Sequence, residues 1–337
     1  MAKTPEADSY RPLVKLKDVE DFRDPGDEAV LGDRRDGKLY RYTPEIKLAV
    51  NVALATGRPL LVWGRTGCGK SLLAFNLARV MRRRYYEFVV TSRSQARDLF
   101  YRFDAVRRLG DAQSKERGSA APERRVARGA LIWQSQYPYV EPGPLWWSID
   151  PEGARRRGYP GTEKPPFQKA ADPVVWEPGA LAGESSLLLI DEIDKAELDF
   201  PNNLLVPLGS WQFTVEEVAR PVTMAPGDAQ DPAKRPLVVI TSNRERELPE
   251  TFLRRCIVLE IPPPTVAALV ELAATVFRRR DPKLFGGIAE QLVELRGAEN
   301  LSTAEFLDAV QAIQKLQAAE PALSEIVRRS AWRATEQ

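Results

Sequence analysis

Hydrophobic residues along this chain gather in short continuous runs, and polar or glycine-rich segments separate the runs. The runs that predict strands are rich in Val, Ile and Leu and lie at 59–63, 86–90, 186–191, 236–241 and 256–261. Because these runs do not alternate with polar residues, both faces of each strand are expected to be buried, as in a parallel sheet between helices. The pattern therefore predicts an α/β domain.

Helices are expected between these strands. Thr43 and Pro44 predict the start of one helix, because a capping hydroxyl followed by proline is a common helix N-terminus, and Gly57 predicts its end. The other helices expected before residue 262 lie at 70–83, 195–208 and 249–255, and a hairpin is expected at 211–224.

Three consecutive prolines, 262–264, make a stiff break in the chain. Only helices are expected beyond it, at 265–280, 285–297, 302–319 and 321–333. We therefore predict an N-terminal arm (1–42), an α/β domain (43–264) and a small helical domain (265–337).

The segment 92–186 separates the second and third strands and is too long for an ordinary connection, so we interpret it as an insertion. Within it, Ser94–Leu109 has amphipathic periodicity and predicts a helix with Leu99, Phe103 and Val106 on one side. Residues 110–130 contain few large apolar groups and predict a flexible loop.

Tryptophan and arginine residues in the insertion permit two interpretations. The residues concerned are Trp133, Trp146, Trp147, Trp176 and Arg155–Arg157. Aromatic and basic side chains together can contact nucleic acid, or can serve a pore or a partner. The favoured interpretation is that the tryptophans pack the insertion against the domain and that the arginines are solvated or paired with acids.

Composition limits the chemistry available to the protein. The 337 residues include no histidine, which excludes Ser-His-Asp and Cys-His catalysis and histidine-ligated zinc or haem. A net charge of +2 does not by itself favour a nucleic-acid partner. Two cysteines, Cys68 and Cys256, cannot make a disulfide framework, and neither a signal peptide nor a membrane segment is visible. A cytoplasmic protein is expected.

A glycine-rich segment after the first strand fits the pattern G-x-x-x-x-G-K-[ST] over its full length. It comprises Gly64, Arg65, Thr66, Gly67, Cys68, Gly69, Lys70 and Ser71, with Leu72 next in the following helix. Glycines let backbone amides surround a phosphate at the positive end of that helix. Lys70 is expected to reach the outer phosphates of ATP, and the Ser71 hydroxyl to bind Mg²⁺. We name Gly64–Ser71 the phosphate loop.

Two carboxylates follow the third apolar run, at Asp191 and Glu192. Ligands of parallel α/β sheets bind where strands end, so both side chains are expected near the phosphate loop. Asp191 is predicted to hold Mg²⁺, and Glu192 to orient or deprotonate a water molecule. The chain is thus able to hydrolyse ATP without an imidazole.

These motifs resemble those of AAA+ ATPases, and within that superfamily the MoxR group. The segments that carry the resemblance are 43–74, 187–205, 238–264 and, more weakly, the helical tail. The resemblance implies a five-stranded parallel sheet in the order 5-1-4-3-2, a helical lid at 265–337, and a homo-oligomeric ring, usually a hexamer, that uses ATP and Mg²⁺. It also implies a protein client or a von Willebrand A-type partner.

Further site residues follow from the same resemblance. The sensor-1 residue falls on Asn243, and the arginine finger, which acts on the neighbouring subunit, falls on Arg255 with Arg254 as the alternative. No arginine stands at the sensor-2 position near 300–307, so Arg296 substitutes for it or the role is absent.

Three functions are compatible with this sequence. The first is a ring-forming ATPase that remodels a partner protein. The second is a nucleotide-gated scaffold or switch in defence or signalling. The third, a motor stimulated by nucleic acid, is the least favoured because the net charge is close to zero.

Overall fold

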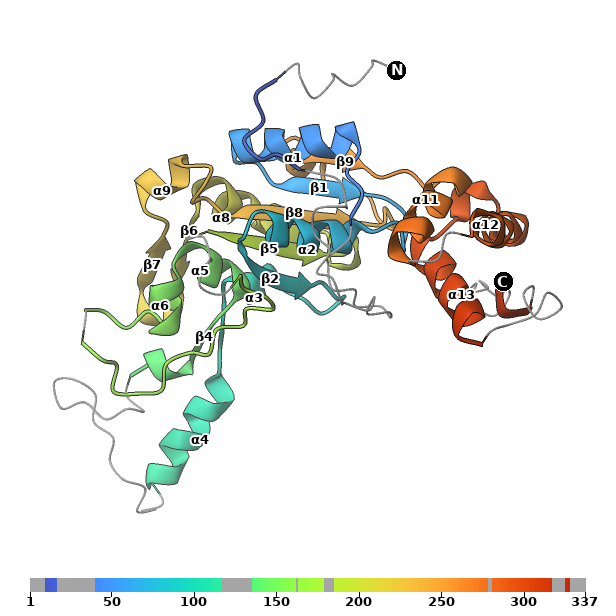
Figure 1. Ribbon diagram of the computed structural model, residues 1–337. Coiled ribbons are helices and arrows are strands. Elements are labelled where there is room, and N and C mark those ends of the chain that lie inside the picture. The colour runs from blue at the N-terminus through green and yellow to red at the C-terminus, as the bar shows by residue number, and fades with distance from the viewer. Residues whose placement is uncertain are drawn as a thin grey trace.

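A computed structural model describes the fold of residues 10–16, 40–116, 135–161, 163–178, 185–277, 281–316 and 325–327. Its centre is a five-stranded sheet with the order β2-β5-β8-β1-β9, and every neighbouring pair is parallel (Figure 1). The strands are β1 (Leu60–Trp63), β2 (Arg84–Val89), β5 (Ser186–Asp191), β8 (Leu237–Ser242) and β9 (Ile257–Glu260). Counted along the chain this is the predicted order 5-1-4-3-2, so the predicted fold class is confirmed.

Helices cover both faces of the sheet, which is why the strands are continuously apolar. On one face, Leu60 and Leu187 belong to a buried cluster with residues of α1 (Pro44–Thr56) and α2 (Lys70–Val80). On the other face, Leu61 and Leu188 belong to a cluster with residues of the insertion and of the segment after β5. Successive strand residues point to opposite faces, so a fully buried strand needs apolar residues at every position.

The first helix begins and ends where the sequence predicts. The Thr43 hydroxyl accepts a hydrogen bond from the Ile46 amide, and Gly57 closes α1 in the left-handed conformation with φ of 71°. The second helix ends at Val80, earlier than the predicted residue 83, because the chain turns there and enters β2 at Arg84.

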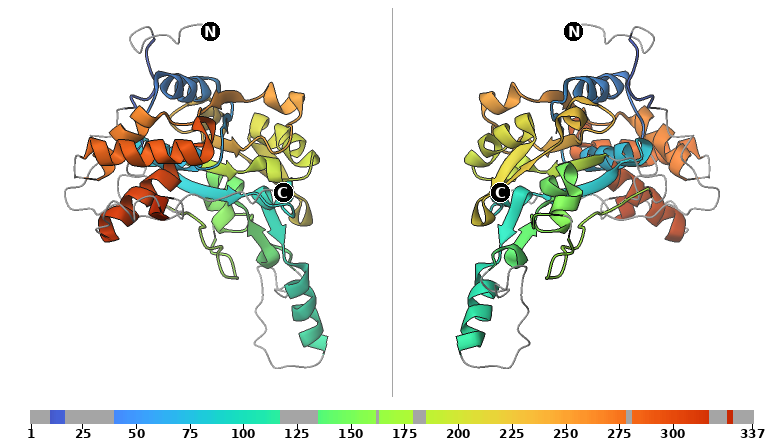
Figure 2. Two further views of the ribbon diagram at one scale, coloured as in Figure 1. Left: turned by 90° about the vertical axis from the view of Figure 1, so that its right-hand side faces the viewer. Right: turned by 90° about the vertical axis from the view of Figure 1, so that its left-hand side faces the viewer.

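The insertion is not the single helix and loop that the sequence predicts. It forms α3 (Ala96–Phe100), β3 (Tyr101–Phe103), α4 (Ala105–Glu116), η5 (Tyr137–Tyr139), β4 (Val140–Pro142), α5 (Pro144–Ile149) and α6 (Pro151–Arg155). The helix predicted over 94–109 is wrong because β3 pairs antiparallel with β4, and this distant partner draws the chain into an extended conformation. The loop predicted from residue 110 is wrong as far as Glu116, where α4 ends. In both views of Figure 2, α4 projects away from the rest of the molecule.

Buried tryptophans attach the insertion to the sheet. Trp146 and Trp147 on α5 are 0% and 2% exposed and lie in the same cluster as the β5 residues Leu188 and Ile190. The Trp176 carbonyl accepts a hydrogen bond from the Tyr85 amide of β2 at 2.8 Å. These contacts support the packing interpretation; Trp133 lies outside the described residues.

Arginines of the insertion fix its irregular backbone. Arg156 is buried and donates to the carbonyls of Tyr159, Pro160 and Glu163, the last at 2.7 Å. Arg157 donates to the carbonyls of Val140 and Gln168. The prediction that these arginines are solvated or paired with acids is therefore wrong for Arg156, which is buried on backbone carbonyls, while Arg157 is half-buried and also donates to backbone carbonyls.

The segment after β5 is more broken than the predicted helix over 195–208. It comprises η7 (Ile193–Lys195), α7 (Asp199–Asn203) and α8 (Leu205–Ser210). The predicted hairpin is confirmed as β6 (Gln212–Val215) and β7 (Arg220–Thr223), joined by η8 (Glu216–Val218). Two short helices follow, α9 (Pro226–Gln230) before β8 and α10 (Glu250–Leu253) before β9.

The helices after β9 form their own hydrophobic cluster beside the sheet (Figures 1 and 2). They are α11 (Val266–Val276), α12 (Pro282–Arg296), η9 (Ala298–Asn300) and α13 (Thr303–Leu316). Of the last predicted helix, 321–333, only 325–327 lie within the described residues. We call this cluster the lid; its predicted boundary at residue 265 stays a prediction.

Parts of the predicted N-terminal arm pack on the α/β domain. The Val14 amide donates to Asn51 Oδ1 at 2.9 Å, and Tyr40 and Tyr42 belong to the cluster under α1 and α2. Arg41 forms an ion pair with Glu271 of α11, so this segment also contacts the lid. No helix in the described part of the chain is long and apolar enough to cross a membrane.

Candidate active site

The phosphate loop connects the end of β1 to the start of α2, and its glycines are required by its shape. Gly67 and Gly69 have φ values of 80° and 95°, a left-handed conformation that side chains disfavour. A Cβ on Gly64 would stand 2.6 Å from Cys68 Sγ and 2.9 Å from the Ile261 carbonyl oxygen. The loop is therefore a tight cradle that has no room for a side chain at Gly64 and whose left-handed backbone disfavours one at Gly67 and Gly69.

Lys70, the first residue of α2, is buried and points back along the loop. Its Nζ atom donates to the carbonyl oxygens of Gly64 at 2.8 Å and Arg65 at 2.9 Å, and to Asn243 Oδ1 at 2.7 Å. A buried ammonium group needs such partners, because desolvation without them is costly. The phosphate loop is thereby tied to the end of β8.

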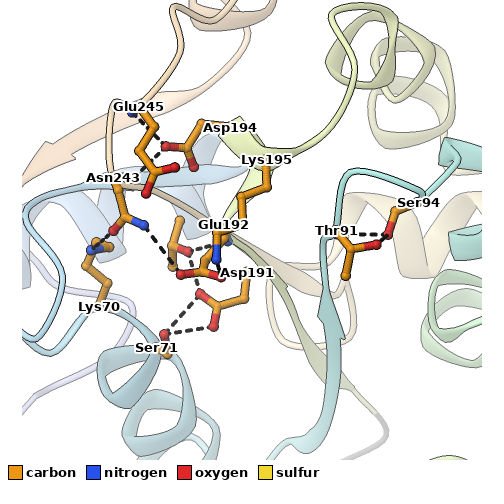
Figure 3. Close-up of polar contacts among 11 residues, drawn as sticks. Lys70, Ser71, Thr91, Ser94, Asp191, Glu192, Asp194, Lys195, Asn243 and Glu245 are labelled. Atoms are coloured by element: carbon orange, nitrogen blue, oxygen red, sulfur yellow. Dashed lines mark hydrogen bonds and ion pairs between the residues drawn. The ribbon is translucent and has the colours of Figure 1, made fainter. Parts of the chain in front are cut away.

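Asp191, at the end of β5, meets Ser71 from the first turn of α2. The Ser71 hydroxyl lies 2.9 Å from each carboxylate oxygen of Asp191 (Figure 3). From the neighbouring strand, the Thr241 hydroxyl donates to Asp191 Oδ1. Thr241 is fully buried and also accepts a hydrogen bond from the Glu192 amide at 2.8 Å. The predicted pair Ser71 and Asp191 is thus brought together, and Thr241 fixes its position.

Glu192 turns out of β5 toward the same cluster. Its backbone has φ of 60°, an uncommon conformation for a residue with a Cβ, and such strain concentrates at functional sites. Lys195 Nζ donates to Glu192 Oε2 at 2.5 Å, and Asn243 Nδ2 donates to Oε1 at 3.4 Å. The hydrogen bond with Glu192, more than any other effect, raises the pKa of Lys195.

Asn243 lies between Lys70 and Glu192, as Figure 3 shows, and its side-chain amide contacts both. Its backbone amide donates to Asp194 Oδ2 at 3.0 Å. The predicted residues Lys70, Glu192 and Asn243 therefore form one connected polar cluster with Ser71 and Asp191 at the carboxyl ends of β1, β5 and β8. We call these five residues the core site.

The two candidate finger arginines are not part of this cluster. Arg254 pairs with Glu250 at 2.6 Å, and Arg255 reaches the Leu205 carbonyl at 3.4 Å. Both arginines are exposed and precede β9. Arg254 and Arg255 lie where β9 begins, whereas the phosphate loop lies where the neighbouring parallel strand β1 ends. The two positions are therefore roughly 20 Å apart along the strand direction, which is beyond an arginine's reach.

The lid contacts the phosphate loop through a serine. A Cβ on Gly67 would stand 2.2 Å from Ser302 Oγ, so the Ser302 side chain lies directly against this glycine. Arg296, the alternative sensor-2 candidate, instead pairs with Glu305 inside the lid at 2.7 Å. No arginine of the described lid residues is seen to contact the phosphate loop.

The remaining predicted loop residues have different environments. Arg65 and Thr66 are exposed at the tip of the loop, and Leu72 is half-buried in the first turn of α2. Burial raises the pKa of the Cys68 thiol despite the nearby charge of Lys70. A raised pKa disfavours the reactive thiolate, which argues against a redox role for Cys68.

The residues present fit a nucleoside triphosphate with Mg²⁺. The left-handed glycines provide a backbone cradle for phosphate, and the hydroxyl and carboxylate of Ser71 and Asp191 are oxygen donors of the kind that Mg²⁺ prefers. Among the described residues, no three His, Cys, Asp or Glu side chains are grouped to hold a metal ion by themselves. A cation held by Ser71 and Asp191 would therefore take further ligands from phosphate oxygens and water.

A comparison with protein families decides the relationship of this chain. Residues 59–256 match the family described as AAA domain (dynein-related subfamily). The chain belongs to this AAA family. The match covers the phosphate loop and the core site, and it ends immediately after Arg254 and Arg255. The AAA fold is of the nucleotide-hydrolysing ATPase type.

Other comparisons add little to this assignment. No curated protein matches the chain. Among solved structures, a mutant of RuvB from Thermotoga maritima is 14% identical, with 85% of this chain and 67% of that chain covered and a TM-score of 0.42. Domain III of the replication initiation protein DnaA from the same organism is 12% identical, with 86% and 92% covered and a TM-score of 0.39.

Sequence reasoning missed four residues of this AAA site: Thr241, Asp194, Lys195 and Ser302. A signal existed for Thr241, because a hydroxyl inside a fully buried strand needs a partner. Asp194 and Lys195 follow Asp191 within one turn, but only the structure shows which groups they contact. No local pattern connects Ser302 with Gly67, since one precedes the lid helix α13 and the other belongs to the phosphate loop.

Proposed function

We propose that this AAA protein is a Mg²⁺-dependent ATPase that acts as a ring and remodels a partner protein. The observation that carries the proposal is the core site: Ser71 and Asp191 in contact, with Asn243 between Lys70 and Glu192. Lys70 would bind the outer phosphates, and Ser71 with Asp191 would hold the metal ion, which neutralises phosphate charge when bound. Glu192 would take the proton of the attacking water.

Ring assembly is proposed from the position of Arg254 and Arg255. Neither reaches the phosphate loop of its own chain, and both are exposed, so a finger role requires a second copy of the chain. A head-to-tail interface repeated around an axis would close into a ring, for which six subunits are proposed. The ring is proposed to remodel a client protein, or a von Willebrand A-type partner of the kind found with MoxR-like ATPases.

The experiment that tests the activity replaces Glu192 with Gln. Glu192→Gln keeps the size of the side chain but removes the base, so we expect ATP turnover to fall on the order of 100- to 10,000-fold while ATP remains bound. Glu197→Gln changes an exposed carboxylate nearby and is the matched control; its turnover should equal that of the wild type. Unchanged turnover in Glu192→Gln overturns the assignment of the base.

The same variant separates remodelling from a switch. If ATP binding alone assembles the ring and releases a partner in Glu192→Gln, the protein is a nucleotide-gated scaffold. If assembly occurs but the partner is released only by the wild type, hydrolysis drives remodelling, as proposed. The described part of the insertion gives the nucleic-acid motor no support, because Trp146, Trp147, Arg156 and Arg157 are engaged in its packing.

A further inference from the structure

Asp194 is a buried carboxylate that has no place in the proposed reaction. It lies in η7, three residues after Asp191, and is only 2% exposed. Its Oδ2 atom accepts two hydrogen bonds, from the Asn243 amide at 3.0 Å and the Glu245 amide at 2.9 Å. Both donors belong to the loop that follows β8.

The loop is shaped so that one carboxylate can bind both amides. Arg244, between the two donors, has φ of 60°, which turns the backbone on itself, and its own amide donates to Ser242 Oγ at 3.0 Å. Three successive amides are thus bound by side-chain oxygens. Hydrogen bonds to an ionised acceptor are shorter and stronger than neutral ones, so Asp194 is well suited to fix this turn.

The backbone position of Asn243 decides where its side chain can reach. An asparagine side chain is short, and here its amide bridges two groups, Lys70 Nζ at 2.7 Å and Glu192 Oε1 at 3.4 Å. A shift of the loop by about 1 Å would break one contact or both, and displacements of this size impair catalysis strongly. The bond to Asp194 is therefore the support on which the Asn243 bridge depends.

From these contacts we infer that Asp194 is a positioning residue, which holds Asn243 in place between Lys70 and Glu192. Figure 3 shows Asp194 on the far side of Asn243 from Lys70. Its other oxygen, Oδ1, is buried and has no hydrogen-bond partner among the described residues. Burying a carboxylate that has one oxygen without a hydrogen bond costs folding free energy. A neutral side chain that only capped the loop would avoid this cost, so the carboxylate favours a role beyond capping. The inference rests on the proposed ATPase function.

A double-mutant cycle tests the dependence on Asn243. We expect Asp194→Ala to lower kcat by about 10- to 100-fold with KM for ATP changed less than about 2-fold, and Asn243→Ala to do at least as much. Because Asp194 acts through Asn243, the double variant should be no slower than Asn243→Ala alone. Losses that multiply overturn the inference. Asp199→Ala, an exposed carboxylate on α7, is the matched control.

Amide hydrogen exchange tests the same contact without relying on catalysis. In Asp194→Ala, exchange of the Asn243 and Glu245 amides should accelerate while β5 and β1 stay protected. In Asn243→Ala both amides and their acceptor remain, so protection should persist. Equal loss of protection in the two variants, or none in Asp194→Ala, contradicts the positioning role.

The two readouts separate failure of the inference from failure of the proposed function. If the wild type does not hydrolyse ATP, the proposed function fails, but the exchange pattern still decides whether Asp194 holds the loop. Asp194→Asn serves where Asp194→Ala does not fold, because its carbonyl oxygen still accepts a hydrogen bond. Its kcat should lie between those of the wild type and Asn243→Ala, and a kcat equal to that of the wild type overturns the need for charge.

Discussion

Gly67 allows a quantitative test of the contact between the phosphate loop and the lid. Replacing it with alanine places a Cβ in a backbone with φ of 80°, where a left-handed residue costs about 1–2 kcal/mol. The same Cβ would lie 2.2 Å from Ser302 Oγ and 3.1 Å from Ser302 Cβ. Overpacking of this kind costs about 1–3 kcal/mol, so Gly67→Ala should lower the free energy of unfolding by about 2–5 kcal/mol.

Ser302→Ala separates the two contributions. It removes Oγ and leaves Cβ, and it loses a long capping bond, in which the Glu305 amide donates to Oγ at 3.4 Å. Rotation of Ser302 would also relieve the clash, but it would break this cap and leave the 3.1 Å contact. In the Ser302→Ala background, the cost of Gly67→Ala should therefore fall toward the backbone strain of about 1–2 kcal/mol.

The free energy of unfolding is measured by urea unfolding at 25 °C without nucleotide for four proteins: the wild type, Gly67→Ala, Ser302→Ala and the double variant. Working without nucleotide matters, because Gly67→Ala is also expected to weaken phosphate binding and ligand-linked stability would confuse the result. A cost of Gly67→Ala that is the same in both backgrounds would contradict the contact, since Ser302 would then not lie against Gly67.

Three further predictions follow from other parts of the structure. Arg255→Ala and Lys70→Ala should each abolish ATP turnover. If each arginine finger acts on a neighbour in a closed ring, an equimolar mixture of the two variants should regain roughly a quarter of wild-type turnover. No recovery of turnover argues against a finger in trans. Trp146→Ala should cost about 3–5 kcal/mol in urea unfolding because Trp146 is 0% exposed, whereas exposed Lys169→Ala should change stability by less than about 0.5 kcal/mol. At pH 8, Cys68 should react with iodoacetamide more slowly than a free cysteine, since burial raises its pKa; peptide mass spectrometry measures the rate, and reaction at the free-cysteine rate contradicts the raised pKa.

Features that depend on short stretches of sequence could be predicted. The cap at Thr43, the left-handed Gly57, the glycines of the phosphate loop and the five apolar strands each follow from one local pattern. The strand order came from a resemblance to a family, because no local pattern records which strand lies beside which. The position of Asp191 near Ser71 then followed from the rule that parallel strands present their carboxyl ends at one edge.

Features that depend on distant partners could not be predicted. The helix expected over 94–109 has favourable periodicity, but pairing of Tyr101 with Pro142 is worth more than continuing the helix, and α4 begins separately after Asp104. Here a local signal was overlooked, since Asp104 caps α4 by accepting from the Arg107 amide at 2.8 Å. The Ser302 contact with Gly67 depends on how the lid packs, which helix periodicity does not encode.

The strand order also affects how this protein is made. β1, which carries the phosphate loop, lies between β8 and β9, so Leu60 waits for Val239 and Ile257 before it gains its neighbours. At about 5–20 residues per second, a ribosome needs roughly 10–40 s to add the intervening chain. During that interval the nascent chain carries a complete phosphate-loop motif, but β1 has no neighbouring strand before β8 is made and lacks its second neighbour until β9 is made. Until then, apolar strands such as Leu60–Trp63 must be shielded from aggregation. A nascent chain is therefore expected to bind nucleotide only after β9 has been synthesised.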